Sequence, residues 1–280
     1  MSGSARKGAE RGRVGVWIAS AWLFLVVVGG ALAPWLPLQP VEGTDVRSKH
    51  RPPSLAHLFG TDSIGRDVFS RTVWGARVSL LVGVTAVVIG VVIGGSLGLM
   101  AGYLRRATDR TISFVFDSLL AFPAIVFAVL VTSLTGRSMV WVTLVLGVLS
   151  VAPMGRLARA TTLTVASQPF VEAATSLGAT PTRIIRREVV PNVVPTLMSF
   201  ALIGCGIAIV AEGSLAFLGL SVEGSVSWGT IIVDGSSGRT LRIAPHVALL
   251  PITVLFLTVL SLNWIGSVVQ RRADSRISKL

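Results

Sequence analysis

The amino-acid sequence predicts an all-α membrane protein with six transmembrane helices. Hydrophobic residues make up 52% of the 280 positions and charged residues only 14%. The mean hydropathy is +0.76, which is typical of an integral membrane protein. Several apolar runs reach the roughly 20 residues that a helix needs to cross a bilayer. These runs lack the alternation of barrel strands, so helices must satisfy the backbone polar groups in lipid.

The first transmembrane helix is expected over residues 14–33, after a cytoplasmic tail of residues 1–13. The basic residues that precede the apolar run are Arg6, Lys7, Arg11 and Arg13, and a cleaved signal peptide would show the same pattern. The run is longer than the apolar part of a typical signal peptide, however, and Pro34-Trp35-Leu36-Pro37 suits a membrane interface. We therefore predict an uncleaved helix, followed by an extracytoplasmic or interfacial segment over residues 34–77.

The remaining five helices are expected within a core of residues 78–270. A polar insert of residues 168–191 separates the fourth helix from the fifth, and residues 271–280 form a second cytoplasmic tail. The five apolar runs are Val78–Tyr103, Ile112–Leu134, Met139–Met154, Val193–Phe217 and Val247–Val269.

Glycines recur every fourth residue in the second expected helix, at Gly90, Gly94 and Gly98. Small residues at this spacing form one helix face that another helix can approach closely. The pattern fits either static packing within this chain or a face that slides against another helix as the protein changes conformation.

The distribution of Lys and Arg predicts the orientation. With the N-terminus inside, 16 of the 25 basic residues lie inside, and six of the remaining nine lie in the long segment after the first helix. Basic residues in long external segments count less in setting topology. Both termini and the polar insert are therefore expected in the cytoplasm. The same placement at helix ends explains the net charge of +12 without a nucleic-acid partner.

The polar insert has clear helix start and stop signals. Ser167 can cap a first helix with Pro169 in its first turn, and Gly178 can end that helix in a left-handed conformation. Thr180-Pro181 can begin a second helix, and Pro191 and Pro195 are expected to stop or kink the chain beyond it. We interpret the insert as a docking element for another protein, with a solvated amphipathic loop as the alternative.

This insert resembles the EAA motif of ABC-importer permeases. The matching residues are Glu172, Ala173, Ala174, Gly178, Val190 and Pro191. The family has an apolar residue where this chain has Glu188, so the match is weaker at its distal end. The resemblance implies the fold of a type I ABC-importer permease, with the insert seated in a groove of a cytoplasmic ATPase. Arg183 and Arg186 are expected to take part in this coupling.

The segment before the second helix reads HLFGTDSIGRDVFSRTVWGARVSL over residues 57–80. A turn at Gly60-Thr61-Asp62 leads into an amphipathic stretch, which by itself indicates a structured segment at the membrane interface. An ion pair between Asp67 and Arg71, at i and i+4, would contribute only a few tenths of a kcal/mol at a surface.

The same segment resembles the signature of the second-permease (C-type) subfamily of dipeptide and oligopeptide permeases. The residues singled out for this signature are Gly60, Thr61, Asp62, Gly65, Arg66, Asp67, Ser70 and Arg71. The runs Glu212–Leu220 and Trp228-Gly229, and Asp117 with Leu120–Pro123, fit the same subfamily. The resemblance covers nearly everything from Leu58 to the last helix. It implies a multi-pass permease of the bacterial inner membrane that carries short peptides, although related systems carry nickel or other small solutes.

The energy source is expected in partner proteins, so the chain is predicted to be a transport subunit and not an enzyme. A P-loop requires Gly-Lys-Ser/Thr, and none of Lys7, Lys49 and Lys279 can complete it. We therefore expect ATP and Mg²⁺ to bind only in one or two ABC ATPases. A second homologous permease, an extracytoplasmic binding protein and a peptide substrate complete the expected partners. His50, His57 and His246 lack the spacing of a metal site.

A gradient-driven secondary transporter is the rival class, because buried acids mark ion-coupled carriers. Glu212 is the main candidate, but it lies about 28 Å of helix beyond Val193, near the outer boundary. We expect Glu212 and Trp228 either to contribute to the substrate path or outer gate, or to be an interfacial acid and an interface anchor.

Overall fold

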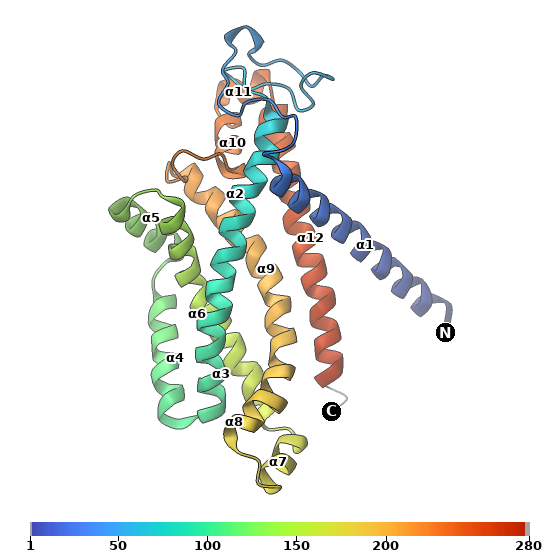
Figure 1. The fold of residues 1–280 in the computed structure, drawn as a ribbon, viewed down its shortest axis with the longest axis vertical. Helices are drawn as coiled ribbons and strands as arrows, with labels where there is room; N and C mark the ends of the chain where they lie inside the picture. Colours follow the sequence, from blue (N-terminus) through green and yellow to red (C-terminus); the bar gives the residue numbers. More distant parts are fainter. Residues whose placement is uncertain (1, 278–280) are drawn as a thin grey trace.

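The computed structural model describes the backbone of residues 2–277 and the side chains of residues 14–272. The basic side chains expected in the two tails, at residues 6–13 and at Arg276 and Lys279, lie outside this description. Within residues 2–277 the chain is helical, and its only strand-like pairing is a single bridge between Thr61 and Asp67. The expected all-α fold is confirmed. The long helices run between a polar end at the top of Figure 1 and the short helices α7 and α8 at the opposite end.

The helices are α1 (Ser2–Leu32), α2 (Val68–Ile89), α3 (Gly95–Leu104), α4 (Arg106–Ala121), α5 (Ala124–Thr135), α6 (Met139–Ala166), α7 (Pro169–Ser176), α8 (Pro181–Ile184), α9 (Val190–Phe217), α10 (Trp228–Gly235), α11 (Gly238–Ile243) and α12 (His246–Ile277). Two π-helical turns, η2 (Gly90–Gly94) and η3 (Ile185–Val189), join α2 to α3 and α8 to α9, and a short 3₁₀ helix, η1 (Val46–Ser48), lies in the polar end.

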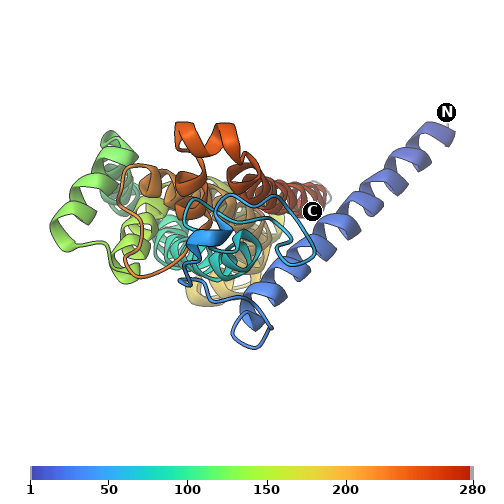
Figure 2. The ribbon, with the colours of Figure 1, turned by 90° about the horizontal axis from the view of Figure 1, so that it is seen from above.

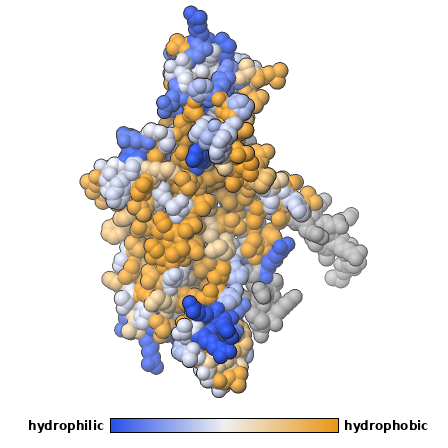
Figure 3. Space-filling view, viewed as in Figure 1, coloured by the Kyte–Doolittle hydropathy of each residue, from blue (hydrophilic) through white to orange (hydrophobic). Residues whose placement is uncertain are grey.

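Within the described residues, five helices are long and apolar enough to span a membrane, and the bent pair α4–α5 gives a sixth span if it crosses as one. This agrees with the six expected helices. Hydrophobic residues form a band along the middle of the molecule, and hydrophilic residues gather at its two ends (Figure 3). Seen from above, α1 diverges from the bundle toward its N-terminal end (Figure 2).

The second spanning helix begins at Val68, not at Val78 as expected. Asp67 caps it, since its carboxylate accepts a hydrogen bond from the amide of Ser70 at 2.7 Å. The expected interfacial segment of residues 34–77 therefore contains the start of this helix. The sequence around Arg71 and Arg77 is too polar to suggest a spanning helix, so the predicted start was placed ten residues too late. In the structure Arg71 is buried.

The third expected helix, Ile112–Leu134, is broken into α4 and α5, which meet at an angle of 81°. Phe122, between them, has an extended backbone with φ −83° and ψ 132°. Pro123 explains this conformation, because a proline pushes the preceding residue out of the helical region. The break leaves the side of α6 and α9 next to α5 incompletely covered.

The fourth and fifth expected helices are both longer than predicted. Helix α6 continues past Met154 to Ala166. The fifth span starts at Pro181 and not at Val193, because α8, η3 and α9 form one continuous helix to Phe217. Pro191 and Pro195 do not stop it. Pro191 follows the wide π-helical turn η3, and such turns are a recognised way to accommodate an irregular ladder of backbone hydrogen bonds.

The glycine face of the second span packs against α6 within this chain. A Cβ atom added at Gly94 would collide with the carbonyl oxygen of Val151, and one added at Gly98 with that of Gly155. On the other side of α6, the fully buried ring of Phe116 occupies the space that a side chain at residue 155 would need. Backbones in such close approach give the three helices α3, α6 and α4 a fixed spacing.

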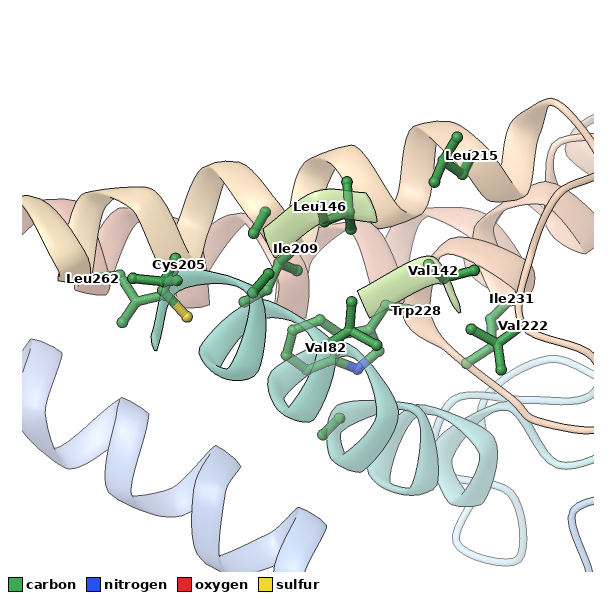
Figure 4. Close-up of a cluster of buried hydrophobic side chains, with 14 of the residues drawn as sticks. Val82, Val142, Leu146, Cys205, Ile209, Leu215, Val222, Trp228, Ile231 and Leu262 are labelled. Carbon is green, nitrogen blue, oxygen red and sulfur yellow. The ribbon is translucent and has the colours of Figure 1, made fainter. Parts of the chain in front are cut away.

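The main core lies where α2, α6, α9, α10 and α12 meet (Figure 4). Val82, Ile209 and Trp228 are among its fully buried side chains. Helix α1 is attached at its edge, where Trp22 Nε1 donates a hydrogen bond to Thr258 Oγ1 at 3.1 Å.

We predict that Gly98→Ala destabilises the protein by about 1–3 kcal/mol, because the new methyl group forces α3 away from α6. Thermal unfolding of the purified protein in detergent measures this. Gly95→Ala on the same helix is the control, since its methyl group would meet only Leu197 Cδ1 at 3.4 Å. Equal melting temperatures for the two variants would contradict the close-packing account.

Candidate functional site

Residues 34–67 with α10 and α11 form the polar end of the molecule, which we call the outer cap after the orientation expected from the sequence. Its central turn folds back on itself, because the amide of Thr61 donates to the carbonyl of Arg51 and that of Val68 to the carbonyl of Gly60, both at 3.0 Å. Gly60 and Gly65 have positive φ angles of 72° and 86°, which favour glycine. A side chain at residue 60 would also meet His246 and Arg51. The signature glycines are therefore required by the turn.

A network of two aspartates and two arginines ties the cap to the helices. Arg66 Nε and Arg71 Nη1 donate to Asp62 Oδ2 at 2.6 and 2.8 Å, and Arg66 Nη2 and Arg71 Nη2 donate to Asp234 Oδ2 at 2.8 and 3.0 Å. Asp62 is 1% exposed and Arg71 3%. Asp234 and Arg66 are partly exposed, at 37% and 19%. Removing one partner of the buried Asp62–Arg71 pair would leave a buried charge uncompensated.

Asp62 is held ionised by its surroundings. Burial acts to raise the pKa of this carboxyl group, but amide hydrogen bonds from Arg66 and Ile64 and the Arg66 guanidinium outweigh it and lower the pKa below 3.8. The hydrogen bonds of the outer cap therefore stabilise the ionised carboxylate of Asp62.

The other polar signature residues also hold the cap. Thr61 Oγ1 donates to the carbonyl of Ser48, and Ser70 Oγ accepts from the amide of Gln39 at 3.1 Å. Asp67 Oδ1 lies 2.9 Å from His57 Nδ1. The Asp67–Arg71 pair considered from the sequence is not formed, because Arg71 points to Asp62 and Asp234 instead. Sequence reasoning missed Asp234, whose partners are far away in the chain.

Glu212 and Trp228 lie inside the protein, 1% and 0% exposed. Trp228 donates from its backbone amide to Ser79 Oγ at 3.1 Å and from Nε1 to the carbonyl of Thr72 at 2.9 Å. Ser79 Oγ in turn donates to Glu212 Oε2 at 3.3 Å. Glu212 therefore joins α9 to α2 and α10, and Trp228 is too deep to be an interface anchor.

The insert projects from the opposite end of the molecule as α7 and α8 (Figure 1). Gly178 ends α7 with φ +80°, as predicted. The N-cap is Gln168 and not Ser167, and neither it nor Thr180 makes a side-chain capping bond. Among the motif residues, Glu172 and Ala173 are exposed and Ala174 is half-buried.

The insert is supported by a small core of its own. Val171, Ile184, Val189 and Val193 are buried together beneath it. On the outside, Leu177 is 88% exposed, and a pocket of about 220 Å³ opens between α7 and α8 beside Ala174 and Gly178. The sequence reasoning did not single out Leu177 or this pocket.

A basic strip flanks the pocket. Arg183, Arg186 and Arg187 are exposed along one side of α8 and η3, and Pro191 is exposed above them. The structure brings Glu172, Gly178, Arg183 and Arg186 to one end of the molecule.

An apolar groove of about 570 Å³ opens on the side of the bundle left uncovered by the α4–α5 break. Its walls come from α4, α5, α6 and α9. They include Leu120, Phe122, Phe127, Pro153, Phe200 and Ile207. No single stretch of sequence shows this groove, although the Pro123 break was a signal for it. In the described part of the chain, no group of three or more metal-binding side chains comes together.

We predict that Asp62→Asn destabilises the protein by about 3–5 kcal/mol, because it removes the carboxylate shared by the buried Arg71 and the half-buried Arg66. Thermal unfolding in detergent is the measurement, with Glu223→Gln as control, since its pair with Arg137 is exposed at the same end of the molecule.

The contribution of Asp62 to stability should depend on pH. Because the folded pKa of Asp62 is lowered, this contribution to the free energy of unfolding is present above the unfolded pKa near 3.8 and disappears as the pH falls below that value. Wild type should therefore lose stability below about pH 4, and Asp62→Asn should lose less; equal losses would contradict the network's role.

Comparison with known proteins gives consistent matches. Residues 94–279 match the family described as binding-protein-dependent transport system inner membrane component. The chain is 34% identical over 267 residues to the glutathione transport system permease protein GsiD of Pectobacterium atrosepticum, covering 94% of this chain and 87% of that protein. It is 36% identical over 261 residues to the same-named protein of Shigella dysenteriae, covering 92% and 86%.

The fold is also similar to solved structures. An inward-facing structure of the MetNI methionine ABC transporter superposes with a TM-score of 0.57 at 20% identity, covering 71% of this chain and 96% of that one. A crystal structure of an amino acid ABC transporter with histidines gives 0.56 at 17% identity, covering 73% and 94%.

Proposed function

Because the chain belongs to the binding-protein-dependent transport system inner membrane component family, we propose that it forms half of the translocation pathway of an ATP-driven importer of short peptides. The chain is a multi-pass inner membrane permease subunit of an ABC importer and not itself an enzyme. The observation that carries the peptide cargo is its 34% identity, over 94% of its length, to a permease named for glutathione, which is a tripeptide. The signature residues of the outer cap support the same class.

The partners are inferred from the family. A second homologous permease supplies the other half of the pathway, one or two cytoplasmic ABC ATPases supply energy, and an extracytoplasmic binding protein delivers peptide. ATP and Mg²⁺ bind in the ATPases, since no lysine of this chain stands in a P-loop. The open groove between α5, α6 and α9 suits a pathway completed by the second permease.

Both termini and the insert lie in the cytoplasm in this proposal, and the outer cap lies outside. The basic strip of the insert and the excess of Lys and Arg at that end support this orientation.

Coupling runs through a single rigid element. The exposed insert residues Glu172, Ala173 and Leu177 dock on the ATPase, and α8 continues without a break into the span that ends at Phe217. This helix has 37 residues, about 55 Å, and carries Glu212 near its far end. Displacement of the insert when the ATPases close on ATP is therefore transmitted along the helix to the contacts below the outer cap, which shifts the permease between two global states.

We expect the complex purified through a tag after Leu280 to take up a labelled tripeptide into proteoliposomes with its binding protein. Uptake should require ATP on the side where that tag is accessible, and this chain purified alone should hydrolyse no ATP. The measurement is radiolabel retained in the vesicles with ATP or with a non-hydrolysable analogue. ATP-dependent uptake of nickel in place of peptide would refute the cargo, and uptake driven only by an ion gradient would refute the importer mechanism.

We predict that Glu172→Lys reduces peptide uptake at least tenfold while the complex still inserts, because it reverses a charge on the exposed face of α7. Gly178→Ala should impair coupling in the same direction, since a side chain at φ +80° strains the turn that positions α7. ATPase activity and uptake measured together report the coupling.

Gly219→Ala is the matched control for the glycine variant. Gly219 has φ +74° and, like Gly178, nothing within 4 Å of an added Cβ atom, but it lies at the opposite end of the molecule. Normal coupling in Gly178→Ala, or equal loss in Gly219→Ala, would contradict the role of the insert.

A further inference from the structure

An ion pair lies beside the apolar groove and has no part in the coupling path from the insert to the outer cap. Asp117 on α4 and Arg156 on α6 are joined by a hydrogen bond of 2.5 Å from Nη2 to Oδ1. Asp117 follows Phe116, and Arg156 follows Gly155. Phe116 packs against Gly155 in the tight contact between α4 and α6. This packing fixes the backbone positions from which the two side chains extend, while their charged ends stay exposed.

The pair lies beside the groove, toward the end nearer the insert. On α4, Asp117 and Leu120 are three residues apart, and on α6, Pro153 and Arg156 are three residues apart, so each couple lies on one helix face. Leu120 and Pro153 both line the groove. The charges therefore stand next to the groove on its side nearer the insert.

Both side chains are open to their surroundings, with Asp117 61% and Arg156 53% exposed. Arg156 lies about 25 Å along α6 from Met139, and α6 is one of the helices long and apolar enough to cross a membrane. Charges in a spanning segment seldom face lipid and usually face a polar cavity or another protein. This face therefore belongs to a pathway or contact and not to the bilayer.

A second ion pair on the same two helices has a different construction. Arg159 binds Asp109 through Nε and through Nη2, the latter at 2.7 Å, and Asp109 also accepts from Ser113 Oγ at 3.2 Å. Its members are only 34% and 21% exposed. That pair is saturated and holds α4 to α6. Asp117 and Arg156, by contrast, share one hydrogen bond within the described residues and keep free acceptor and donor positions.

We propose that Asp117 and Arg156 bind the charged ends of a zwitterionic peptide at the inner end of the groove, Arg156 taking the terminal carboxylate and Asp117 the terminal ammonium. This rests on the proposed peptide importer function. The net charge of the site does not change. At Arg156 the peptide carboxylate replaces the carboxylate of Asp117, and at Asp117 the peptide ammonium replaces the guanidinium of Arg156. The groove of about 570 Å³ lies in the range of small-molecule sites and offers apolar walls for side chains of varied shape.

The test compares three probes in proteoliposomes that hold the full complex and the same binding protein: Ala-Phe-Ala, its C-terminal amide and its N-acetyl derivative. Wild type should prefer the free tripeptide. Arg156→Gln should reduce the preference over the amide about tenfold, and Asp117→Asn the preference over the acetyl derivative by a similar factor, as expected for loss of a hydrogen bond between charged groups. A preference is the ratio of uptake of the free tripeptide to uptake of a derivative. The same binding protein serves wild type and variants, so its own selectivity cancels when these ratios are compared.

Control variants separate binding from folding. Arg159→Lys removes the two-point hydrogen bonding of the neighbouring pair but keeps its positive charge near Asp117, so it should leave both preferences unchanged, whatever its effect on total uptake. Arg156→Lys keeps the cation and should retain most of the preference over the amide. Variants at residues 117 and 156 that lower total uptake with unchanged preferences would overturn the proposal and leave the pair a helix contact.

The outcomes also separate this proposal from the one on which it rests. Wild type that takes up no peptide would refute the peptide importer, and the charged subsite with it. Wild type that takes up all three probes equally would keep the importer and overturn the subsite.

Discussion

The continuity of one helix, from Pro181 in the insert to Phe217 below the outer cap, is the constraint on which the rest of the structure depends. Because this helix is continuous, its contacts at the insert and below the outer cap are linked through one backbone. At the insert it shares a small core with α7. At the far end Glu212 meets Ser79, which also accepts the amide of Trp228. The proposed docking of the insert and the contacts of Glu212 therefore lie on the same helix.

Two kinds of contact hold the other helices around this unit. Between α3 and α6 the backbones touch through glycines, which leaves no side chain to rearrange and favours movement as one body. At the outer cap the contact is electrostatic, and the buried Asp62 and Arg71 join a long connecting segment to α10 through Asp234. Removing one partner of the buried Asp62–Arg71 pair would be costly, because the remaining buried charge would be left uncompensated.

The irregular parts of the helices lie where function is proposed. Pro123 breaks the third span and opens the groove beside α6 and α9, whereas Pro191 lies in a helix that continues through a π-helical turn. The same residue type therefore has opposite outcomes. The difference is in the surroundings, because α4 and α5 lie at the edge of the bundle, while α9 packs against α2, α6 and α12 along its length.

The sequence by itself determined the number of spanning helices, the place of the insert and the turn at Gly178, because hydropathy, charge at helix ends and the conformational freedom of glycine are local properties. It also singled out the polar residues of the outer cap. It did not determine their partners: Arg71 pairs with Asp62 and Asp234 and not with Asp67, and Trp228 is buried. Nor did it show the groove or the Asp117–Arg156 pair. These features join residues far apart in the chain, so only the packing of the helices could decide them.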